Sequence, residues 1–192
     1  MRKKIAILGS TGSIGKSLIN ILKEQQKKSV ITLLSTNKNY KELLNQANYF
    51  NVKNLIISDK KTFKKCLSKK IFKNRNLYNN FDSLNLIFKK KNDYTMSAIS
   101  GLEGLHPTLK IIRYSKKIAI ANKESIICAW HIILKQLKKN KTIFIPVDSE
   151  HFSLWFGLNN NIKKNIEKIF ITASGGPLNK LPLSKFKNVT IS

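Results

Sequence analysis

Residues 3–15 read Lys-Lys-Ile-Ala-Ile-Leu-Gly-Ser-Thr-Gly-Ser-Ile-Gly. The apolar run 5–8 ends at Gly9, and a stretch typical of a helix, residues 16–27, follows Gly15. A strand, a tight glycine turn and a helix in this order present backbone N–H groups and a helix N-terminus to a pyrophosphate. The stretch therefore predicts a dinucleotide-binding turn at the start of an α/β domain.

Each glycine of this turn has an expected role. Gly9 allows the sharp turn, Gly12 allows a phosphate to approach the backbone, and Gly15 allows the helix to pack closely on the strand. The spacing is GxxGxxG, which differs from the GxGxxG of the common fingerprint. On the local pattern alone, the alternative is a glycine-rich turn that binds nothing.

Short apolar runs alternate with longer helix-like segments along the rest of the chain. Expected strands are 30–34, 55–57, 94–100, 117–121, 142–147 and 167–173; expected helices are 40–50, 61–72, 81–90, 108–114 and 125–139; residues 74–80 are expected to form a polar loop. This βαβ pattern predicts an α/β fold with a doubly wound, Rossmann-like parallel sheet. Ligands bind such sheets at the carboxyl ends of the strands, so the residues just after each strand carry the functional signal.

Composition limits the function classes. The net charge is +26, which suggests nucleic-acid binding, but only Arg2, Arg75 and Arg113 of the 36 basic residues are arginines. Specific nucleic-acid readers favour arginine for bidentate contacts. We interpret the scattered lysines as solvated surface and expect no specific nucleic-acid partner; a basic groove for phosphorylated ligands or RNA is the alternative.

No apolar run is long enough for a membrane span, so we expect no membrane partner. The first strand begins so near residue 1 that we expect no leader peptide. Cys66 and Cys128 lie far apart and form no CxxC motif, which fits free thiols in a reducing compartment. We therefore expect a cytoplasmic protein.

The end of the second expected strand bears on the choice of nucleotide. NAD-binding domains place a carboxylate there for the ribose 2′-hydroxyl. Residues 25–41 contain no acid, and the strand ends in Ser35-Thr36-Asn37-Lys38-Asn39. A lysine and small polar donors suit a 2′-phosphate and favour NADPH. An ordinary loop in a lysine-rich protein is the alternative.

Two carboxylates follow the strand expected at 142–147. In an extended chain Asp148 and Glu150 point to the same side, away from Ser149. They can converge on a hard divalent cation, Mg²⁺ or Mn²⁺, whose remaining ligands must come from elsewhere. A surface acidic pair or a helix cap is the alternative.

Two further strand ends carry weaker signals. Asn122-Lys123-Glu124 can bind an anion or a ribose, or it can merely cap a helix. Ser174-Gly-Gly-Pro177 can form a nest of N–H groups for phosphate, or a plain turn. The histidines are weak signals: His131 is expected to pack within an apolar helix, and His106 and His151 have no partner at metal-ligand spacing.

In combination the motifs are far more specific. The segments 9–15, 121–125, 146–151 and 173–177 (Gly-Ser-Thr-Gly-Ser-Ile-Gly, Ala-Asn-Lys-Glu-Ser, Pro-Val-Asp-Ser-Glu-His and Ala-Ser-Gly-Gly-Pro), in this order and spacing, closely resemble 1-deoxy-D-xylulose 5-phosphate reductoisomerases. The resemblance covers essentially the whole chain. It implies rearrangement of 1-deoxy-D-xylulose 5-phosphate and NADPH-dependent reduction to 2-C-methyl-D-erythritol 4-phosphate, a step of non-mevalonate isoprenoid synthesis. It also implies a homodimer.

The resemblance assigns roles residue by residue. NADPH contacts are implied for Thr11, Gly12, Ser13, Ile14, Asn37, Lys38, Asn39, Asn122 and Glu124. Substrate contacts are implied for Lys123, Ser149, Glu150 and Ser174, with Lys123 and Glu150 as catalytic residues. Asp148 and Glu150 are implied as ligands of Mg²⁺ or Mn²⁺.

The resemblance also sets an expected domain division. We expect an NADPH-binding domain over residues 1–147 and the beginning of a catalytic domain over residues 148–192. Family members continue past the Ser-Gly-Gly-Pro motif into a lid, an Asn-Lys pair for phosphate and a third metal carboxylate. We therefore expect little turnover from these 192 residues alone. A non-catalytic NADPH-binding remnant, or one part of a split enzyme, is the alternative function.

Overall fold

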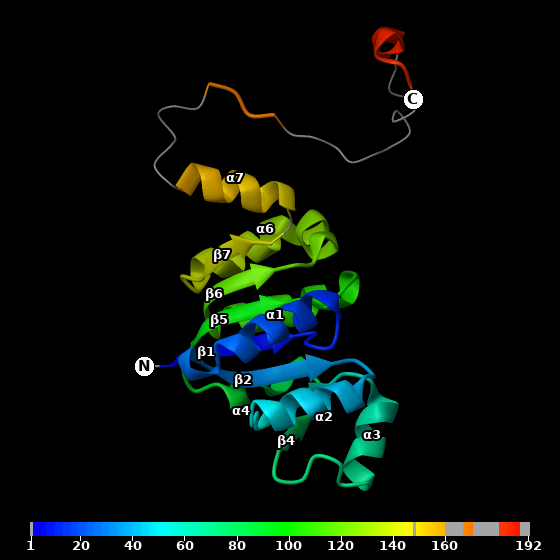
Figure 1. Cartoon of the computed structure of the whole chain (residues 1–192), viewed down its shortest axis with the longest axis vertical. Coiled ribbons are helices and arrows are strands. Elements are labelled where there is room, and N and C mark those ends of the chain that lie inside the picture. Colours follow the sequence, from blue (N-terminus) through cyan, green and yellow to red (C-terminus); the bar gives the residue numbers. More distant parts are fainter. Residues whose placement is uncertain (1, 148, 160–166, 171–180, 189–192) are drawn as a thin grey trace. The chain divides into compact units, whose positions relative to one another are not determined.

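The computed structural model describes residues 2–147, 149–159, 167–170 and 181–188 (Figure 1). The chain forms two compact units, Met1–Phe152 and Ser153–Ser192. The first unit contains the parallel sheet and its helices. Within the second unit, residues 167–170 have no regular secondary structure and Leu183–Asn188 form a 3₁₀-helix.

Seven strands form one sheet in the order β4-β3-β2-β1-β5-β6-β7, and every pair is parallel. The strands are β1 (Lys3–Leu8), β2 (Ser29–Thr36), β3 (Asn54–Ile57), β4 (Asn76–Tyr78), β5 (Asn92–Ser97), β6 (Ser115–Ile120) and β7 (Ile143–Pro146). The chain runs outward from β1 to β4, then crosses back to place β5 on the other side of β1. The β1–β5 boundary is therefore the topological switch point, where open α/β sheets bind ligands. The predicted doubly wound fold is confirmed.

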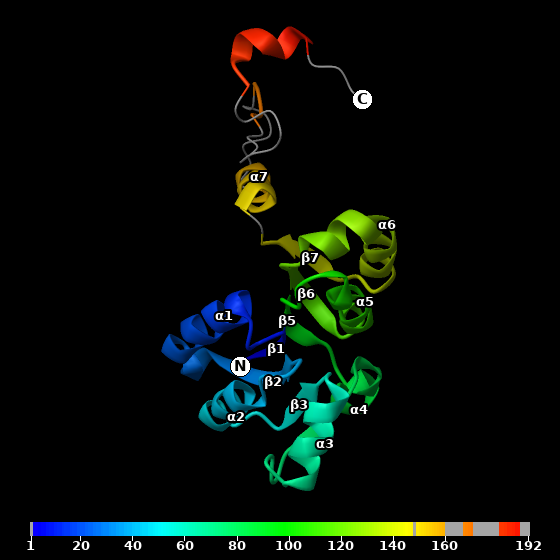
Figure 2. The same ribbon diagram turned by 90° about the vertical axis from the view of Figure 1, so that its right-hand side faces the viewer.

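Helices cover both faces of the sheet (Figure 2). They are α1 (Ser13–Glu24), α2 (Tyr40–Tyr49), α3 (Lys60–Ser68), α4 (Leu84–Ile87), α5 (Leu105–Ile112) and α6 (Lys123–Lys139), and α7 (Ser149–Asn159) follows β7. Short 3₁₀-helices lie at Gln26–Lys28, Phe81–Ser83 and Leu102–Gly104. Parallel sheets need this double cover because both of their faces are apolar.

Alternate residues of each strand serve two separate cores. Ile5 and Ile7 of β1 pack with Ile19 of α1 and Leu43 of α2 on one face. Ala6 and Leu8 of the same strand pack with residues of α4, α5 and α6 on the other face, among them Ile111. The period of two along an extended chain thus divides one apolar run between two layers.

Helix α6 differs from its predicted packing face. Its buried residues are Ser125, Ala129, Ile133 and Leu137, spaced four apart. The spacing of Ile126, Trp130, Ile133, Leu134 and Leu137 predicts that they line one face of the helix, but Trp130 remains 38% exposed. The backbone leaves helical geometry at Ala129, with φ −140° and ψ 26°, which breaks the helix into two parts. A single helical period across the break was therefore the wrong template.

Three predicted elements need correction. Residues 74–80 are not simply a loop, because β4 pairs there with β3 at the sheet edge. The helix expected from residue 16 begins at Ser13, since the glycine turn itself opens it. The strand expected at 167–173 is absent from residues 167–170, and residues 171–173 lie outside the described part.

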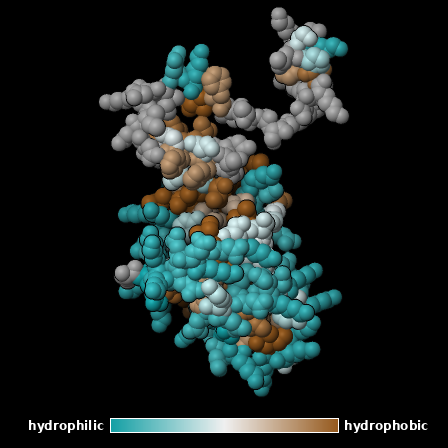
Figure 3. Space-filling view, viewed as in Figure 1, coloured by the Kyte–Doolittle hydropathy of each residue, from teal (hydrophilic) through white to brown (hydrophobic). Residues whose placement is uncertain are grey.

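The surface of the sheet unit is strongly polar. Hydrophilic residues cover most of the face formed by α1 and α2 (Figure 3). This supports the interpretation of the lysines as solvated surface. No helix in the described part of the chain is long and apolar enough to cross a membrane.

Candidate functional site

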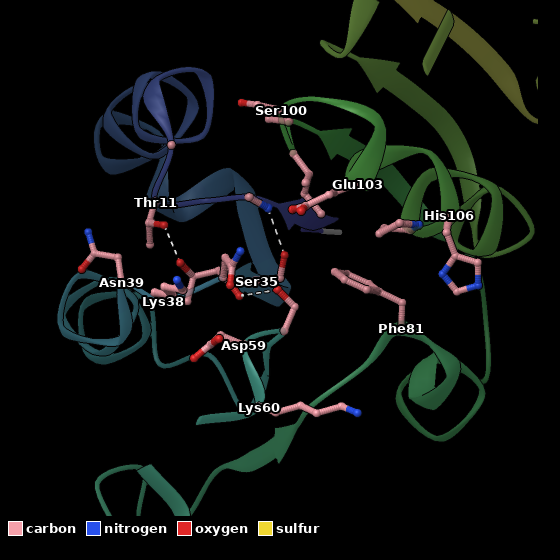
Figure 4. Close-up of a pocket in the computed structure, with 18 of the residues that line it drawn as sticks. Thr11, Ser35, Lys38, Asn39, Asp59, Lys60, Phe81, Ser100, Glu103 and His106 are labelled. Carbon is pink, nitrogen blue, oxygen red and sulfur yellow. Dashed lines mark hydrogen bonds between the residues drawn. The ribbon is translucent and has the colours of Figure 1, made fainter. Parts of the chain in front are cut away.

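A cleft of about 990 Å³ lies at the carboxyl ends of β1, β2, β3 and β5 (Figure 4). Its volume suits a ligand of nucleotide size. The residues that line it are Gly9, Thr11, Gly12, 35–39, 58–61, Phe81, 98–100, Glu103, His106 and Pro107. The cleft opens at the switch point, because Gly9 follows β1 and Ala98 follows β5.

Close packing explains two of the glycines in the turn. Gly9 has φ +76°, and a Cβ there would lie 2.6 Å from the Ala98 carbonyl oxygen. A Cβ on Gly15 would lie 2.3 Å from the Gly9 carbonyl oxygen and 2.6 Å from the Ser10 Cα. Neither neighbour can move aside, because both are backbone. The roles predicted for Gly9 and Gly15 are confirmed.

Helix α1 begins without a side-chain cap. Its N-cap is Gly12, and no side chain accepts a hydrogen bond from the first turn. The first N–H groups of any helix lack partners within the helix, and the helix dipole makes this end attractive to anions. Ser13 and Ile14 lie in this turn with exposed side chains, so their backbone N–H groups are what they offer a phosphate.

Buried and partly buried hydrogen bonds hold the glycine turn to the end of β2 and to α2. Ser35 accepts from the Gly9 N–H through Oγ at 2.9 Å and from the Ser10 N–H through its carbonyl at 2.9 Å. The Thr11 and Thr36 hydroxyls bond to each other at 2.6 Å. Gln46 of α2 donates from Nε2 to the Ser10 carbonyl at 3.1 Å. The turn is thus fixed in shape before any ligand arrives.

The segment predicted to receive the 2′-phosphate lines the same cleft. Asn37, Lys38 and Asn39 are exposed and follow β2 directly. Asn39 also caps α2, because its Oδ1 accepts from the Glu42 N–H at 3.2 Å. The structure therefore brings together Thr11, Gly12 and residues 37–39, which were all predicted as cofactor contacts.

Sequence analysis overlooked the end of β3. Asp59 lines the cleft and caps α3, and the Thr62 N–H and Oγ1 both donate to its Oδ1, at 2.8 and 2.7 Å. These bonds, with lesser help from Lys38 and Lys61, lower the pKa of the Asp59 carboxyl. Its place directly after a strand was the available signal. Phe81, Glu103 and His106 of the lining were also missed as site residues.

Asn122 has a structural task in addition to its predicted one. Its side chain is buried, its Oδ1 accepts from the Ser125 N–H at 2.8 Å, and its Nδ2 donates to the carbonyls of Ile99 and Gly101. It therefore caps α6 and ties down the loop after β5. Asn122, Lys123 and Glu124 are not among the cleft-lining residues, and their ligand contacts stay predictions.

The predicted metal and substrate residues are described only in part. Asp148 and Ser174 lie outside the described residues, and only the backbone of Ser149 and Glu150 is described. That backbone is helical, since α7 begins at Ser149, so the extended geometry that we predicted for Ser149 and Glu150 is wrong. Among the described residues no group of three or more acidic, histidine or cysteine side chains could hold a metal. The metal assignment stays a prediction.

The histidines also depart in part from expectation. His131 is exposed, so the prediction that it packs within the helix is wrong. His106 lines the cleft beside Pro107. His151 is exposed and takes part in an interaction of its own. His106 is therefore part of the cleft lining.

Two family models match the chain. The model of 1-deoxy-D-xylulose 5-phosphate reductoisomerase matches residues 5–130, and that of its C-terminal domain matches residues 144–192. A protein of that name from Pelagibacter ubique (strain HTCC1062) is 58% identical over 98% of this chain and 49% of its own length. One from Wolbachia pipientis subsp. Culex pipiens is 37% identical over 99% of this chain and 49% of its own length. The chain thus spans about half the length of these relatives.

Solved structures of the same name share the fold. The enzyme from Zymomonas mobilis in complex with NADPH superposes with a TM-score of 0.82 at 30% identity, over 99% of this chain and 50% of that chain. A structure in complex with NADPH, fosmidomycin and magnesium gives a TM-score of 0.75 at 27% identity, over 98% of this chain and 49% of that chain.

Proposed function

The chain belongs to the 1-deoxy-D-xylulose 5-phosphate reductoisomerase family, and we propose that its cleft binds NADPH for the conversion of 1-deoxy-D-xylulose 5-phosphate to 2-C-methyl-D-erythritol 4-phosphate. The observation that carries this proposal is the uncapped start of α1 beside a glycine turn at the switch point. The structures of relatives with NADPH and with magnesium support it.

The residues of the cleft fit the cofactor. The pyrophosphate belongs over Gly12, where the first-turn N–H groups of α1 are open. The adenosine 2′-phosphate belongs beside Lys38, since residues 37–39 offer donors and no carboxylate. Asn122 and Glu124 follow β6 and would contact the nicotinamide half of the cofactor. The side chain of Asn122 also holds the loop after β5.

We assign the chemistry to the end of β7 and the start of α6. Asp148 and Glu150 would hold the Mg²⁺ or Mn²⁺, Ser149, Glu150 and Ser174 would bind the substrate, and Lys123 would meet its anionic group. Bound NADPH supplies the hydride, and the cation supplies a Lewis acid and template for the rearrangement. The ammonium of Lys123 is exposed at the first turn of α6 and so is free to turn toward a ligand.

The cellular compartment, the pathway and the oligomeric state are part of the same proposal. We place the enzyme in the cytoplasm, in non-mevalonate isoprenoid synthesis, and expect a homodimer. Two free cysteines, Cys66 and Cys128, support a reducing compartment. No specific nucleic-acid partner is expected, because the lysines are spread over the surface rather than gathered in a groove.

A fluorescence titration of NADPH and NADH with the 192-residue chain tests the cofactor proposal. We expect NADPH to bind about tenfold or more tightly, as one charge-assisted contact to the 2′-phosphate provides. Lys38→Glu should remove the preference. Lys41→Glu, an exposed change on α2 outside the cleft, is the matched control and should retain it. Equal affinities in the unaltered chain would contradict the proposal.

A further inference from the structure

The hydrogen bonds between β2 and β3 locate the adenosine side of the cleft. The Ser58 N–H donates to the Thr36 carbonyl at 3.0 Å, and the Asp59 N–H donates to the Asn37 carbonyl at 3.4 Å. If the 2′-phosphate lies beside Lys38, the base on the same ribose lies at this side of the cleft. The strand next outward from β2 is β3, and Ser58 and Asp59 follow its last residue.

Part of the cleft lining is apolar. The Phe81 ring points toward the middle of the cleft (Figure 4), and Ile99 and Pro107 also line it. Asp59 lies on the wall that carries Ser35 and Lys38 (Figure 4). An aromatic base can therefore rest against apolar side chains while its edge meets a carboxylate.

The carboxylate of Asp59 has an unused acceptor. Both hydrogen bonds that it receives, from the Thr62 N–H and Oγ1, go to Oδ1. No group among the described residues donates to Oδ2. Those bonds and the charges of Lys38 and Lys61 lower the pKa of the Asp59 carboxyl. At neutral pH the group is therefore ionised and can accept hydrogen bonds but cannot donate them.

We propose that Asp59 is a specificity residue for adenine, with Oδ2 accepting a hydrogen bond from the exocyclic amino group of the base. This inference rests on the proposed NADPH function. Adenine presents an amino donor at this edge, whereas hypoxanthine presents a carbonyl oxygen, which a carboxylate repels. Glu103, the other carboxylate of the cleft, lies in the 3₁₀-helix that follows β5, whereas Asp59 follows β3 beside the segment that carries Lys38.

The test compares the affinity of the 192-residue chain for NADPH with that for its deaminated analogue, nicotinamide hypoxanthine dinucleotide phosphate, by fluorescence titration. The unaltered chain should bind NADPH about tenfold or more tightly, the size expected for a charge-assisted hydrogen bond. Asp59→Asn should erase or reverse this ratio, because an amide can donate to the hypoxanthine oxygen. Asparagine also caps helices well, so α3 keeps its cap. Glu24→Gln, an exposed change at the end of α1 outside the cleft, is the control and should leave the ratio unchanged.

The outcomes distinguish failure of the proposed NADPH binding from failure of the proposed role of Asp59. If the unaltered chain binds neither nucleotide, the proposed function fails and the inference with it. If it binds both equally well, the NADPH function stands and the role of Asp59 is overturned. An unchanged ratio in Asp59→Asn, or a lost ratio in Glu24→Gln, also overturns it. The unaltered chain alone decides the question should a variant fail to fold.

Discussion

The helices that follow β1 and β6 begin at the same edge of the sheet but in opposite ways. α1 begins at Gly12 with no side-chain cap, whereas α6 begins at Asn122, whose side chain makes three hydrogen bonds. Asn39 and Asp59 likewise cap α2 and α3. The start of α5 at Gly104 also lacks a side-chain cap, but a 3₁₀-helix precedes it, whereas α1 starts directly after the glycine turn and so offers its first N–H groups to a ligand. The capping side chains stabilise the fold around the cleft, whereas the open N–H groups of α1 are available to a ligand.

The largest effect should come from removing the buried cap. Asn122→Ala leaves the Ser125 N–H and the carbonyls of Ile99 and Gly101 without their partner. We expect a loss of about 3 kcal/mol in the free energy of unfolding, from a lost cap and unsatisfied buried groups. Urea denaturation followed by circular dichroism measures it. A loss below about 1 kcal/mol would show that the cap contributes little to this edge.

The open helix start can be disturbed at two glycines with different results. Gly15→Ala places a Cβ against the Gly9 carbonyl and should cost about 2 kcal/mol of stability, as overpacking does. A Cβ on Gly12 meets the Gly9 oxygen at 3.4 Å, an ordinary contact. Gly12→Ala should therefore change stability by less than about 1 kcal/mol yet weaken NADPH binding about tenfold, because the methyl group faces the phosphate.

Thermal unfolding together with NADPH titration of both glycine variants checks this pair. The prediction fails if Gly12→Ala binds NADPH as well as the unaltered chain does, since the turn would then lie away from the ligand.

An exposed cap should matter less than the buried one. Asn39→Ala removes a single hydrogen bond, from the Glu42 N–H, at an exposed position. We expect a loss of about 1 kcal/mol, typical of a solvent-accessible cap. The same urea experiment gives the number. A loss equal to that of Asn122→Ala would remove the distinction drawn between buried and exposed caps.

The smallest effect concerns the cap that titrates. Hydrogen bonds from Thr62 lower the pKa of the Asp59 carboxyl below its ordinary value in the folded chain. The unfolded chain therefore takes up this proton first as the pH falls. The stabilisation is present at neutral pH and is lost as the pH falls through the folded pKa.

Asp59→Asn should flatten the fall of the urea midpoint between about pH 5 and pH 2, since an amide does not titrate there. The pKa values of Asp82 and Asp93 are also lowered, chiefly by hydrogen bonds from Lys110 and Lys116. Part of the slope should therefore persist in the variant. An unchanged curve in Asp59→Asn would contradict the low pKa assigned to this carboxyl.

The sequence was sufficient for features that depend on neighbouring residues. The turn over residues 9–15, the helix at 40–49 and the apolar runs of the central strands follow from local pattern and glycine spacing. Lys38 could also be placed at the cleft, because it follows a strand of a parallel sheet.

Features that depend on distant partners could not be predicted. β4 is three residues long and exists through its pairing with β3, so periodicity cannot reveal it. The anchoring role of Asn122 depends on carbonyls of residues 99 and 101. The helical start of α7 at Ser149 likewise contradicted an argument built on an extended chain.

The two cysteines have very different access to solvent, and this gives the chain an internal reporter. Cys128 is exposed on α6, whereas Cys66 is the buried residue of α3, 1% exposed, and burial raises the pKa of its thiol. A maleimide dye should therefore label Cys128 in the native protein and reach Cys66 only when that region opens. The labelling rate of Cys66 would then measure how often the nucleotide-binding unit opens locally, and how far a bound nucleotide slows that opening.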